Sequence, residues 1–325
     1  MSVSHLTRLL DMGEYRRCLQ EASMLLAEGA HDAEGEARIQ AAICRSYLEL
    51  TDYQAAIAAG ARAADLARRS GAHDVLGAVL LDLGTAQGQV RRSEDALSSF
   101  EEFLALLPAY TGARCLEGAA RSRQAEVLQC MGRSGEALEA YRMAVHWFDR
   151  YGDEPGAQQC LHAMSRIYLD LRQPGKALRC LRESDHRARV RTESRASRCE
   201  RLLSWARYRL AAGLNAEAAR AGYAALECTE DRLDLQAEAQ LIMCRAALSQ
   251  DLPAEALSLA LAARVAAIDG RHYEQEFEAS QIIFRLLQER GMALLHEVEA
   301  DYRKQGVNIY HYLSERALRE DYHGQ

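Results

Sequence analysis

A unit of about 40 residues recurs along this chain, and each copy contains a short turn followed by an apolar helix start. The copies read YRRCL (15–19), YQAAI (53–57), SEDAL (93–97), SGEAL (134–138), PGKAL (174–178), a looser NAEAA (215–219) and PAEAL (253–257). Their fourth residues, called anchors below, are Cys18, Ala56, Ala96, Ala137, Ala177, Ala218 and Ala256, spaced 38, 40, 41, 40, 41 and 38 residues apart. A fixed period of this size predicts a solenoid, which offers an extended concave surface rather than one deep reactive pocket.

Other positions of the unit repeat as well, and they predict how the helices pack. Twelve residues before each anchor the residue is small: Cys44, Gly84, Ala125, Ser165, Ala206 and Cys244. Seven residues after the anchor, alanine recurs at Ala63, Ala144, Ala225 and Ala263. Small residues let two helix backbones approach closely, so each unit is predicted to be an antiparallel helical hairpin stacked on its neighbours.

Helix signals predict where each hairpin begins and ends. The first helices are expected near 36–49, 74–87, 113–131, 155–171, 195–212 and 233–249, each followed by a partner that begins at the anchor turn. A short hairpin precedes them (4–12 and 14–27), and an eighth could follow (274–289 and 292–304). Helices are expected to stop at Gly71, Gly132, Gly152, Gly213, Gly270 and Gly306.

The pattern resembles that of the tetratricopeptide repeat (TPR) family. In one unit Leu80, Leu83, Gly84, Ala96, Phe100 and Pro108 carry the family's spacing of apolar, small, aromatic and terminal proline positions. The units are longer than the usual repeat, as in the sensory arrays of bacterial regulators that bind peptides. The resemblance implies an all-α, right-handed superhelical solenoid of seven to eight hairpins. We expect residues 1–306 to form the array and 307–325 a C-terminal capping helix.

Composition bounds the remaining possibilities. No apolar stretch approaches the roughly 18 residues that a membrane helix needs, and the N-terminus lacks an apolar signal core, so we expect a cytoplasmic protein. Nine cysteines occur without a C-x-x-C pair, and several occupy small-residue positions, which predicts buried thiols rather than disulfides or metal ligands. Only Lys176 and Lys304 are lysine among 40 basic residues, a bias that indicates a GC-rich bacterial genome.

Catalytic chemistry has little support in the sequence. The ten histidines occur without an H-E-x-x-H motif, and there is neither a G-x-S-x-G elbow nor a phosphate-binding glycine loop. Cys160 and His162 are two residues apart, which directs them to different faces of a helix. We therefore predict no catalytic residues, no metal site and no cofactor, and we expect the protein not to be an enzyme.

The candidate binding residues lie on the first helices. The TPR resemblance implies that the residues 15, 11 and 8 before each anchor face the concave groove, and this spacing puts them on one helix face. The candidate site residues are Arg45, Leu81, His162, Arg166, Leu169, Leu203, Arg207, Leu210, Leu241, Arg245 and Leu248. Arginine at four of the six central positions, flanked by leucine, would suit a protein or peptide segment that carries carboxylates beside apolar side chains.

A structural alternative competes with that interpretation. The same arginines could pair with Glu200, Glu238 or other acids of the scaffold, while the leucines pack against the next repeat. Two functions then stand beside each other: a non-catalytic scaffold or regulator that holds a peptide or protein segment, and a ligand-sensing module of a bacterial signalling or transcription system.

A basic stretch runs from Arg179 to Arg209. Ten arginines against four acids give it a net charge of +6 within a chain of net charge −7. It is either a second interaction face or a solvated helix junction. Because the whole chain is acidic, we expect neither nucleic acid nor a membrane as the partner, while self-association through the array ends is possible.

Overall fold

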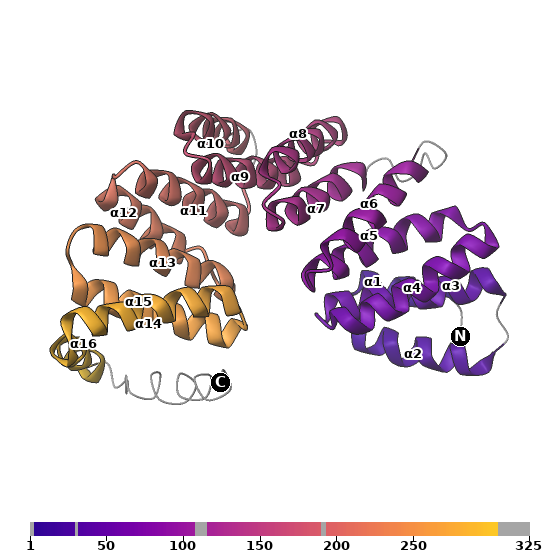
Figure 1. Cartoon of the computed structure of the whole chain (residues 1–325). Coiled ribbons are helices and arrows are strands. Elements are labelled where there is room, and N and C mark those ends of the chain that lie inside the picture. The colour runs from indigo at the N-terminus through magenta and orange to yellow at the C-terminus, as the bar shows by residue number, and fades with distance from the viewer. Residues whose placement is uncertain (1–2, 30–31, 108–115, 190–192, 305–325) are drawn as a thin grey trace. The chain divides into compact units, whose positions relative to one another are not determined.

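The computed structural model describes residues 3–29, 32–107, 116–189 and 193–304, and in these ranges the regular structure consists of sixteen helices (Figure 1). The chain divides into two compact units, Met1–Cys160 and Leu161–Gln325. The predicted capping helix (307–325) and its boundary lie outside the described residues.

The helices of the first unit are α1 (Val3–Asp11), α2 (Tyr15–Glu28), α3 (Ala33–Glu49), α4 (Tyr53–Ser70), α5 (His73–Gln89), α6 (Ser93–Leu106), α7 (Glu117–Cys130) and α8 (Ser134–Tyr151). Helix α9 (Glu154–Asp170) crosses the boundary between the units. The second unit continues with α10 (Pro174–Ala188), α11 (Arg195–Ala211), α12 (Asn215–Leu226), α13 (Leu233–Ser249), α14 (Pro253–Gly270), α15 (Tyr273–Arg290) and α16 (Met292–Lys304). The predicted hairpins and the all-α repeat fold are confirmed.

The packing follows the repeat that the sequence predicts. Every anchor, from Cys18 to Ala256, has 0% of its surface exposed. The small residues twelve positions earlier are also buried, including Ala125 and Ala206. In the first unit α3 contacts its partner α4 and the next first helix α5, and in the second unit α11 contacts α12 and α13 in the same way. The first helices therefore form a file along each unit.

The turn inside the first seven hairpins has one repeated conformation, which the turn between α15 and α16 at Gly291 does not share. The residue five positions before the anchor has a positive φ angle in seven hairpins: Gly13, Thr51, Arg91, Gly132, Arg172, Gly213 and Asp251. The following N–H then bonds back to the last turn of the helix, as Arg133 N does to Leu128 O at 2.9 Å, which is a Schellman motif. Helix α14 stops at Gly270 as predicted, but Arg271 rather than the glycine takes the left-handed conformation. Gly306 lies outside the described residues.

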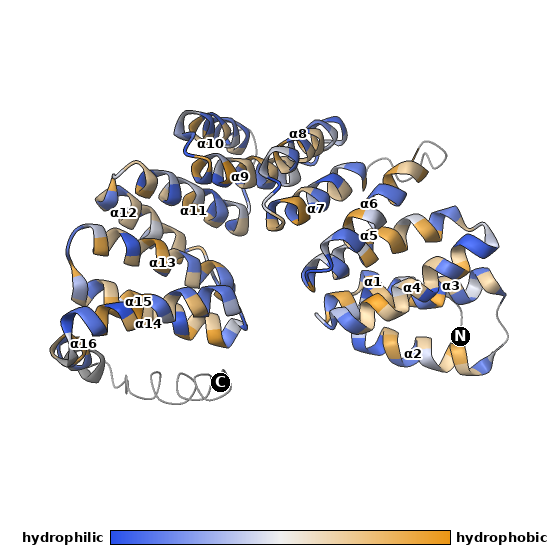
Figure 2. Cartoon of the chain, in the orientation of Figure 1, coloured by the Kyte–Doolittle hydropathy of each residue, from blue (hydrophilic) through white to orange (hydrophobic). Residues whose placement is uncertain are grey.

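Hydrophobic and hydrophilic positions alternate along the helices of both units (Figure 2). In the described residues, no helix combines the length and apolarity needed to cross a membrane. Eight cysteines are described as free thiols, and all but Cys130 are buried. Burial raises the pKa of Cys160 and Cys244 to about 12, so these thiols are protonated at neutral pH and fill small core positions.

Candidate functional site

The candidate residues of the second unit lie on three consecutive first helices, α9, α11 and α13. Their exposure depends on how many residues before the anchor they stand. At fifteen residues before it, His162, Leu203 and Leu241 are 7%, 1% and 4% exposed. Leu203 packs among Cys199, Ala225 and neighbouring core residues. The sequence predicts that these three side chains contact a ligand, and their burial argues against that prediction.

The arginines eleven residues before the anchor come close together. Arg166 and Arg245 are exposed, and the Arg207 side chain is 22% exposed. Burial, together with the positive charges of Arg166 and Arg245, lowers the pKa of Arg207 to about 9. The central guanidinium group is still protonated at neutral pH, and it is poorly solvated and repelled from both sides.

Acids of the next first helix compensate part of this charge. Arg207 forms an ion pair with Glu238 on α13, and Arg245 forms one with Glu278 on α15. In the first unit, Arg45 is bound in the same way by Asp82 of α5. The sequence offered the alternative that these arginines pair with acids of the scaffold. That alternative is correct for Arg207 and Arg245.

Arg166 differs from the other two arginines. It forms no ion pair with any described residue, although its charge is near enough to Glu200 on α11 to act on that carboxyl. Burial raises the pKa of Glu200, and Arg166 and Arg207 are among the charges that oppose this. Arg166 is thus exposed and available to an incoming carboxylate.

The leucines eight residues before the anchor complete an accessible surface. Leu169 and Leu210 are partly exposed, and Leu248 is 38% exposed. We call the surface formed by Arg166, Leu169, Arg207, Leu210, Arg245 and Leu248 the arginine–leucine face. In the first unit, the candidate Leu81 is half-buried against the core cluster that contains Val79 and Leu80.

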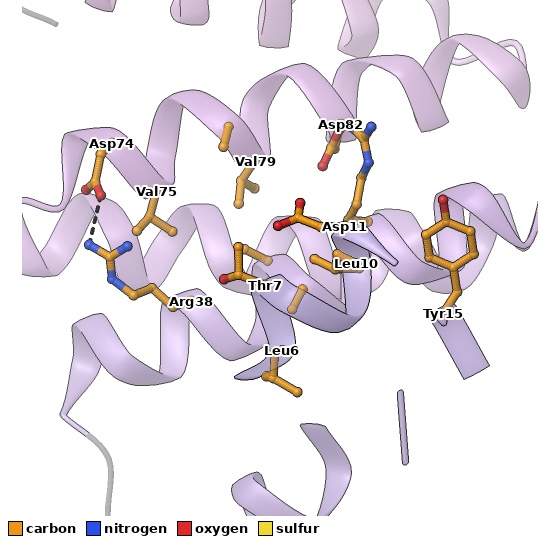
Figure 3. A pocket seen from close by; sticks show the side chains of 14 residues that line it. Leu6, Thr7, Leu10, Asp11, Tyr15, Arg38, Asp74, Val75, Val79 and Asp82 are labelled. Carbon is orange, nitrogen blue, oxygen red and sulfur yellow. Dashed lines mark hydrogen bonds and ion pairs between the residues drawn. The ribbon is translucent and has the colours of Figure 1, made fainter. Parts of the chain in front are cut away.

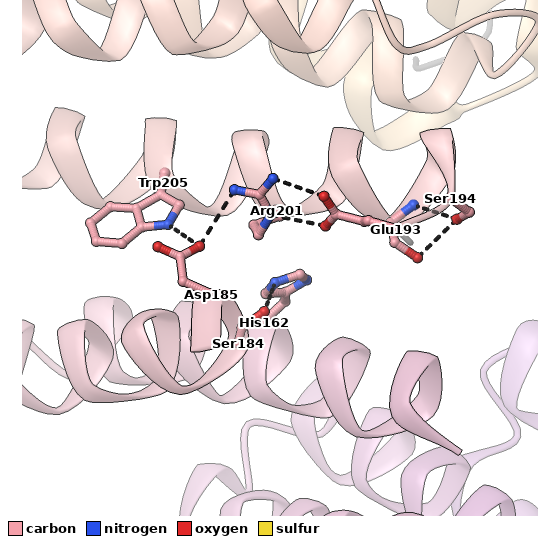
Figure 4. Close-up of polar contacts among 8 residues, drawn as sticks. His162, Ser184, Asp185, Glu193, Ser194, Arg201 and Trp205 are labelled. Carbon is pink, nitrogen blue, oxygen red and sulfur yellow. Dashed lines mark hydrogen bonds and ion pairs between the residues drawn. The ribbon is translucent and has the colours of Figure 1, made fainter. Parts of the chain in front are cut away.

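A polar network that the sequence did not predict lies beside His162 (Figure 4). Arg201 on α11 donates to Glu193 at 2.8 and 2.9 Å and to Asp185 on α10 at 3.4 Å. Trp205 Nε1 donates to the same Asp185 oxygen at 3.1 Å. The network ties α11 to the end of the preceding hairpin. No repeated spacing signals it, since Glu193 precedes α11 in an irregular segment.

His162 itself is a buried neutral side chain. Its Nε2 is 2.7 Å from Ser184 Oγ on α10, while its Nδ1 has no hydrogen-bond partner among the described residues. Burial lowers the pKa of His162 to about 3, with the charges of Arg207 and Arg201 acting in the same direction. His162 therefore carries no charge at neutral pH.

The basic stretch from Arg179 to Arg209 is partly neutralised. Five of its arginines form ion pairs with described acids: Arg187, Arg195, Arg201, Arg207 and Arg209. Arg182 and Arg198 are exposed. Its role as a second interaction face stays a prediction.

Comparison with known proteins supports the fold. No protein-family model matches the sequence, and neither does any curated protein. Similar solved structures are TPR-like repeat proteins, so the TPR resemblance is confirmed at the level of the fold.

Three of these structures illustrate the likeness. The apo form of the quorum sensor NprR from B. thuringiensis has a TM-score of 0.64 at 14% identity, covering 94% of this chain and 87% of NprR. NprR in complex with its cognate peptide NprX has a TM-score of 0.63 at 14% identity, covering 95% of this chain and 89% of that one. Cut9 in the APC/C complex Cut9–Hcn1 has a TM-score of 0.62 at 12% identity, covering 87% of this chain. This chain spans 48% of the length of Cut9.

Proposed function

We propose that this protein is a non-catalytic scaffold or regulator that binds a peptide or protein segment, and that the arginine–leucine face of the second unit is the binding surface. The ligand carries carboxylates beside apolar side chains. The likeness to NprR, which has been solved with its cognate peptide, supports a peptide ligand.

One observation carries the proposal: arginine occupies the same repeat position on three consecutive first helices, with Arg166 and Arg245 exposed on either side of Arg207 in the series. A carboxylate at this point would relieve repulsion among three cations. A charge-assisted hydrogen bond shielded from water contributes about 1.5 to 3 kcal/mol, more than an exposed ion pair.

The leucines add the apolar component. About one helical turn beyond the arginines lie Leu169, Leu210 and Leu248. Charged and apolar side chains therefore alternate on the arginine–leucine face. Burying one such side chain against a ligand contributes about 1.5 to 3 kcal/mol before the entropy of binding is subtracted. A ligand that alternates acidic and apolar residues therefore suits the face best.

A direct test uses a defined probe, the fluorescently labelled peptide acetyl-Glu-Leu-Glu-Leu-Glu-Leu-amide, titrated with the full chain and followed by anisotropy. Replacing Arg166, which a bound peptide would shield from water, with Ala should weaken binding by about 1.5 to 3 kcal/mol. Affinity should also fall as salt is raised, because the screening length shrinks to about 8 Å near physiological ionic strength.

The matched control is Arg220→Ala. Arg220 is exposed on the second helix α12, away from the arginine–leucine face, so its removal should leave affinity unchanged. Equal affinities for the parent, Arg166→Ala and Arg220→Ala proteins would rule out the arginine–leucine face as the binding surface.

A second candidate function is a ligand-sensing module of a bacterial signalling or transcription-regulation system. The likeness to a quorum sensor favours it. The two functions differ in whether the shape of the chain responds to ligand. Small-angle scattering with and without the bound probe separates them, since a sensor should change its radius of gyration and a passive scaffold should not.

A further inference from the structure

The first unit contains a cavity of about 430 Å³ between α1, the start of α2, α3 and α5 (Figure 3). This volume lies within the range of pockets that hold small ligands or single side chains. Leu10, Val75 and Val79 provide apolar surface, Asp11 and Asp82 lie beside them, and Tyr15 stands at one end.

Both arginines of the cavity wall are already engaged by carboxylates. Arg38 donates to Glu34 and to Asp74 at 2.8 Å each. Arg45 donates to Asp82 Oδ1 at 2.7 Å. An anionic ligand would have to displace these internal acids, so the arginines do not make this cavity an anion site.

Negative charge exceeds positive charge around the cavity. Glu49 also pairs with Arg45, at 3.1 Å, and Asp11 lines the cavity without an ion pair to any described residue. Three carboxylates line the cavity beside two guanidinium groups: Asp11, Asp74 and Asp82. Because Asp74 and Asp82 pair with Arg38 and Arg45, the carboxylate of Asp11 is left as one excess negative charge, which favours a cationic ligand.

Asp82 is a buried carboxylate in the cavity wall. Arg45 occupies only its Oδ1, so Oδ2 accepts no hydrogen bond from the described residues. Burial raises the pKa of Asp82, although the charge of Arg45 opposes the rise. A second cation in the cavity would stabilise the ionised carboxylate.

We propose that this cavity binds a basic group on an apolar chain, the chemistry of an arginine or lysine side chain. Asp11 and Asp82 hold the cationic head, while Leu10, Val75 and Val79 contact the methylene stem, as long basic side chains commonly lie along apolar surface. The Tyr15 ring at the cavity end offers a face to the same cation. This site lies in the other unit and takes the opposite charge from the arginine–leucine face, so it stands independently of the proposed function.

The test is calorimetric titration of the full chain with Nα-acetyl-arginine amide and with Nα-acetyl-citrulline amide, its uncharged isostere. The arginine probe should bind at least about tenfold more tightly, because citrulline cannot form charge-assisted bonds to the carboxylates. Asp11→Asn should weaken the arginine probe about tenfold, and Ala78→Trp should abolish binding by filling the cavity. Both positions are exposed, so both variants should fold, which circular dichroism checks.

The control is Asp65→Asn, which removes an exposed carboxylate of α4 that does not line the cavity and should leave binding unchanged. Two further probes identify the source of the cation. Tighter binding of acetyl-Leu-Arg-Leu-amide supports a peptide side chain, and tighter binding of agmatine supports a free amine. Equal binding of the arginine and citrulline probes, no binding of any basic probe, or an arginine affinity unaffected by Asp11→Asn would overturn the proposal.

Discussion

Gly84 on α5 lies directly against the ring of Phe100 on α6, so that a Cβ atom on Gly84 would come within 2.8 Å of the ring atom Cε1. Phe100 is fully buried and has no room to move aside. Gly84→Ala should therefore lower the free energy of unfolding by about 1 to 3 kcal/mol, despite the better helix propensity of alanine. Gly135→Ala on α8, where a Cβ would meet nothing within 4 Å, should not lower it. Denaturant unfolding of both variants measures the difference.

The same packing argument applies to the second unit at Ala206. This residue is fully buried in a cluster with Ala225 and Ile242. Ala206→Leu should overpack the cluster and destabilise the protein by about 1 to 3 kcal/mol, whereas Ala216→Leu on the exposed face of α12 should be close to neutral. Equal denaturant midpoints for the two variants would show that the core tolerates a larger residue at this repeat position.

The hairpin turns offer a stabilising substitution. Thr51 has a φ angle of 60°, a conformation that β-branched residues rarely adopt, while Gly13, Gly132 and Gly213 occupy the same turn position in other hairpins. Thr51→Gly should raise stability by about 0.5 to 1 kcal/mol, after the greater entropy of glycine in the unfolded chain is subtracted. The reverse change, Gly132→Thr, should lower it. Thermal melting of the pair tests the expected opposite signs.

His162 should make stability depend on pH. Its pKa is lowered to about 3 in the folded protein, against about 6.5 in an unfolded chain, so protons bind the unfolded state first. The stability associated with the neutral ring is present above pH 6.5 and is lost as the pH falls from about 6.5 towards 3, by about 2 kcal/mol at pH 5. The His162→Gln variant should lack this component. Unfolding free energies of both proteins at pH 7 and pH 5 provide the measurement.

Much of the fold could be predicted because one rule acts repeatedly. Each anchor, such as Ala96, must be small where two helices touch, and a partner such as Phe100 follows at a fixed distance, so the sequence itself reports the packing. The same repetition placed arginine at one position of three consecutive first helices, and the role of these arginines as a binding site stays a prediction. Repetition predicts which residues hold equivalent positions on successive helices, and the charges of Arg166 and Arg245 do act on Arg207.

The burial of the residues fifteen positions before the anchor could not be predicted. Whether His162 or Leu203 faces a groove or a neighbouring helix depends on how far the next hairpin tilts, and the helical spacing carries no information on that tilt. The Asp185–Arg201–Glu193 network was also missed, because its residues come from two hairpins and repeat nowhere else. Glu238 could be named as an alternative partner of Arg207, but the choice depends on side-chain conformation.

The pairing of Arg207 with Glu238 provides the sharpest distinction between a binding face and a scaffold. If the arginine–leucine face binds acidic ligands, Glu238 competes with the ligand for Arg207, and Glu238→Gln should raise affinity for the Glu-Leu peptide severalfold, up to about tenfold for 1.4 kcal/mol. If Arg207 serves the scaffold alone, the same variant should lose about 1 to 3 kcal/mol of stability without any gain in binding. Glu217→Gln is the control, since its partner Arg209, 3.7 Å away, lies outside the arginine–leucine face. Anisotropy titration and denaturant unfolding of both variants separate the outcomes. Affinity and stability are then measured for each variant, so a gain in binding is told apart from a loss of stability.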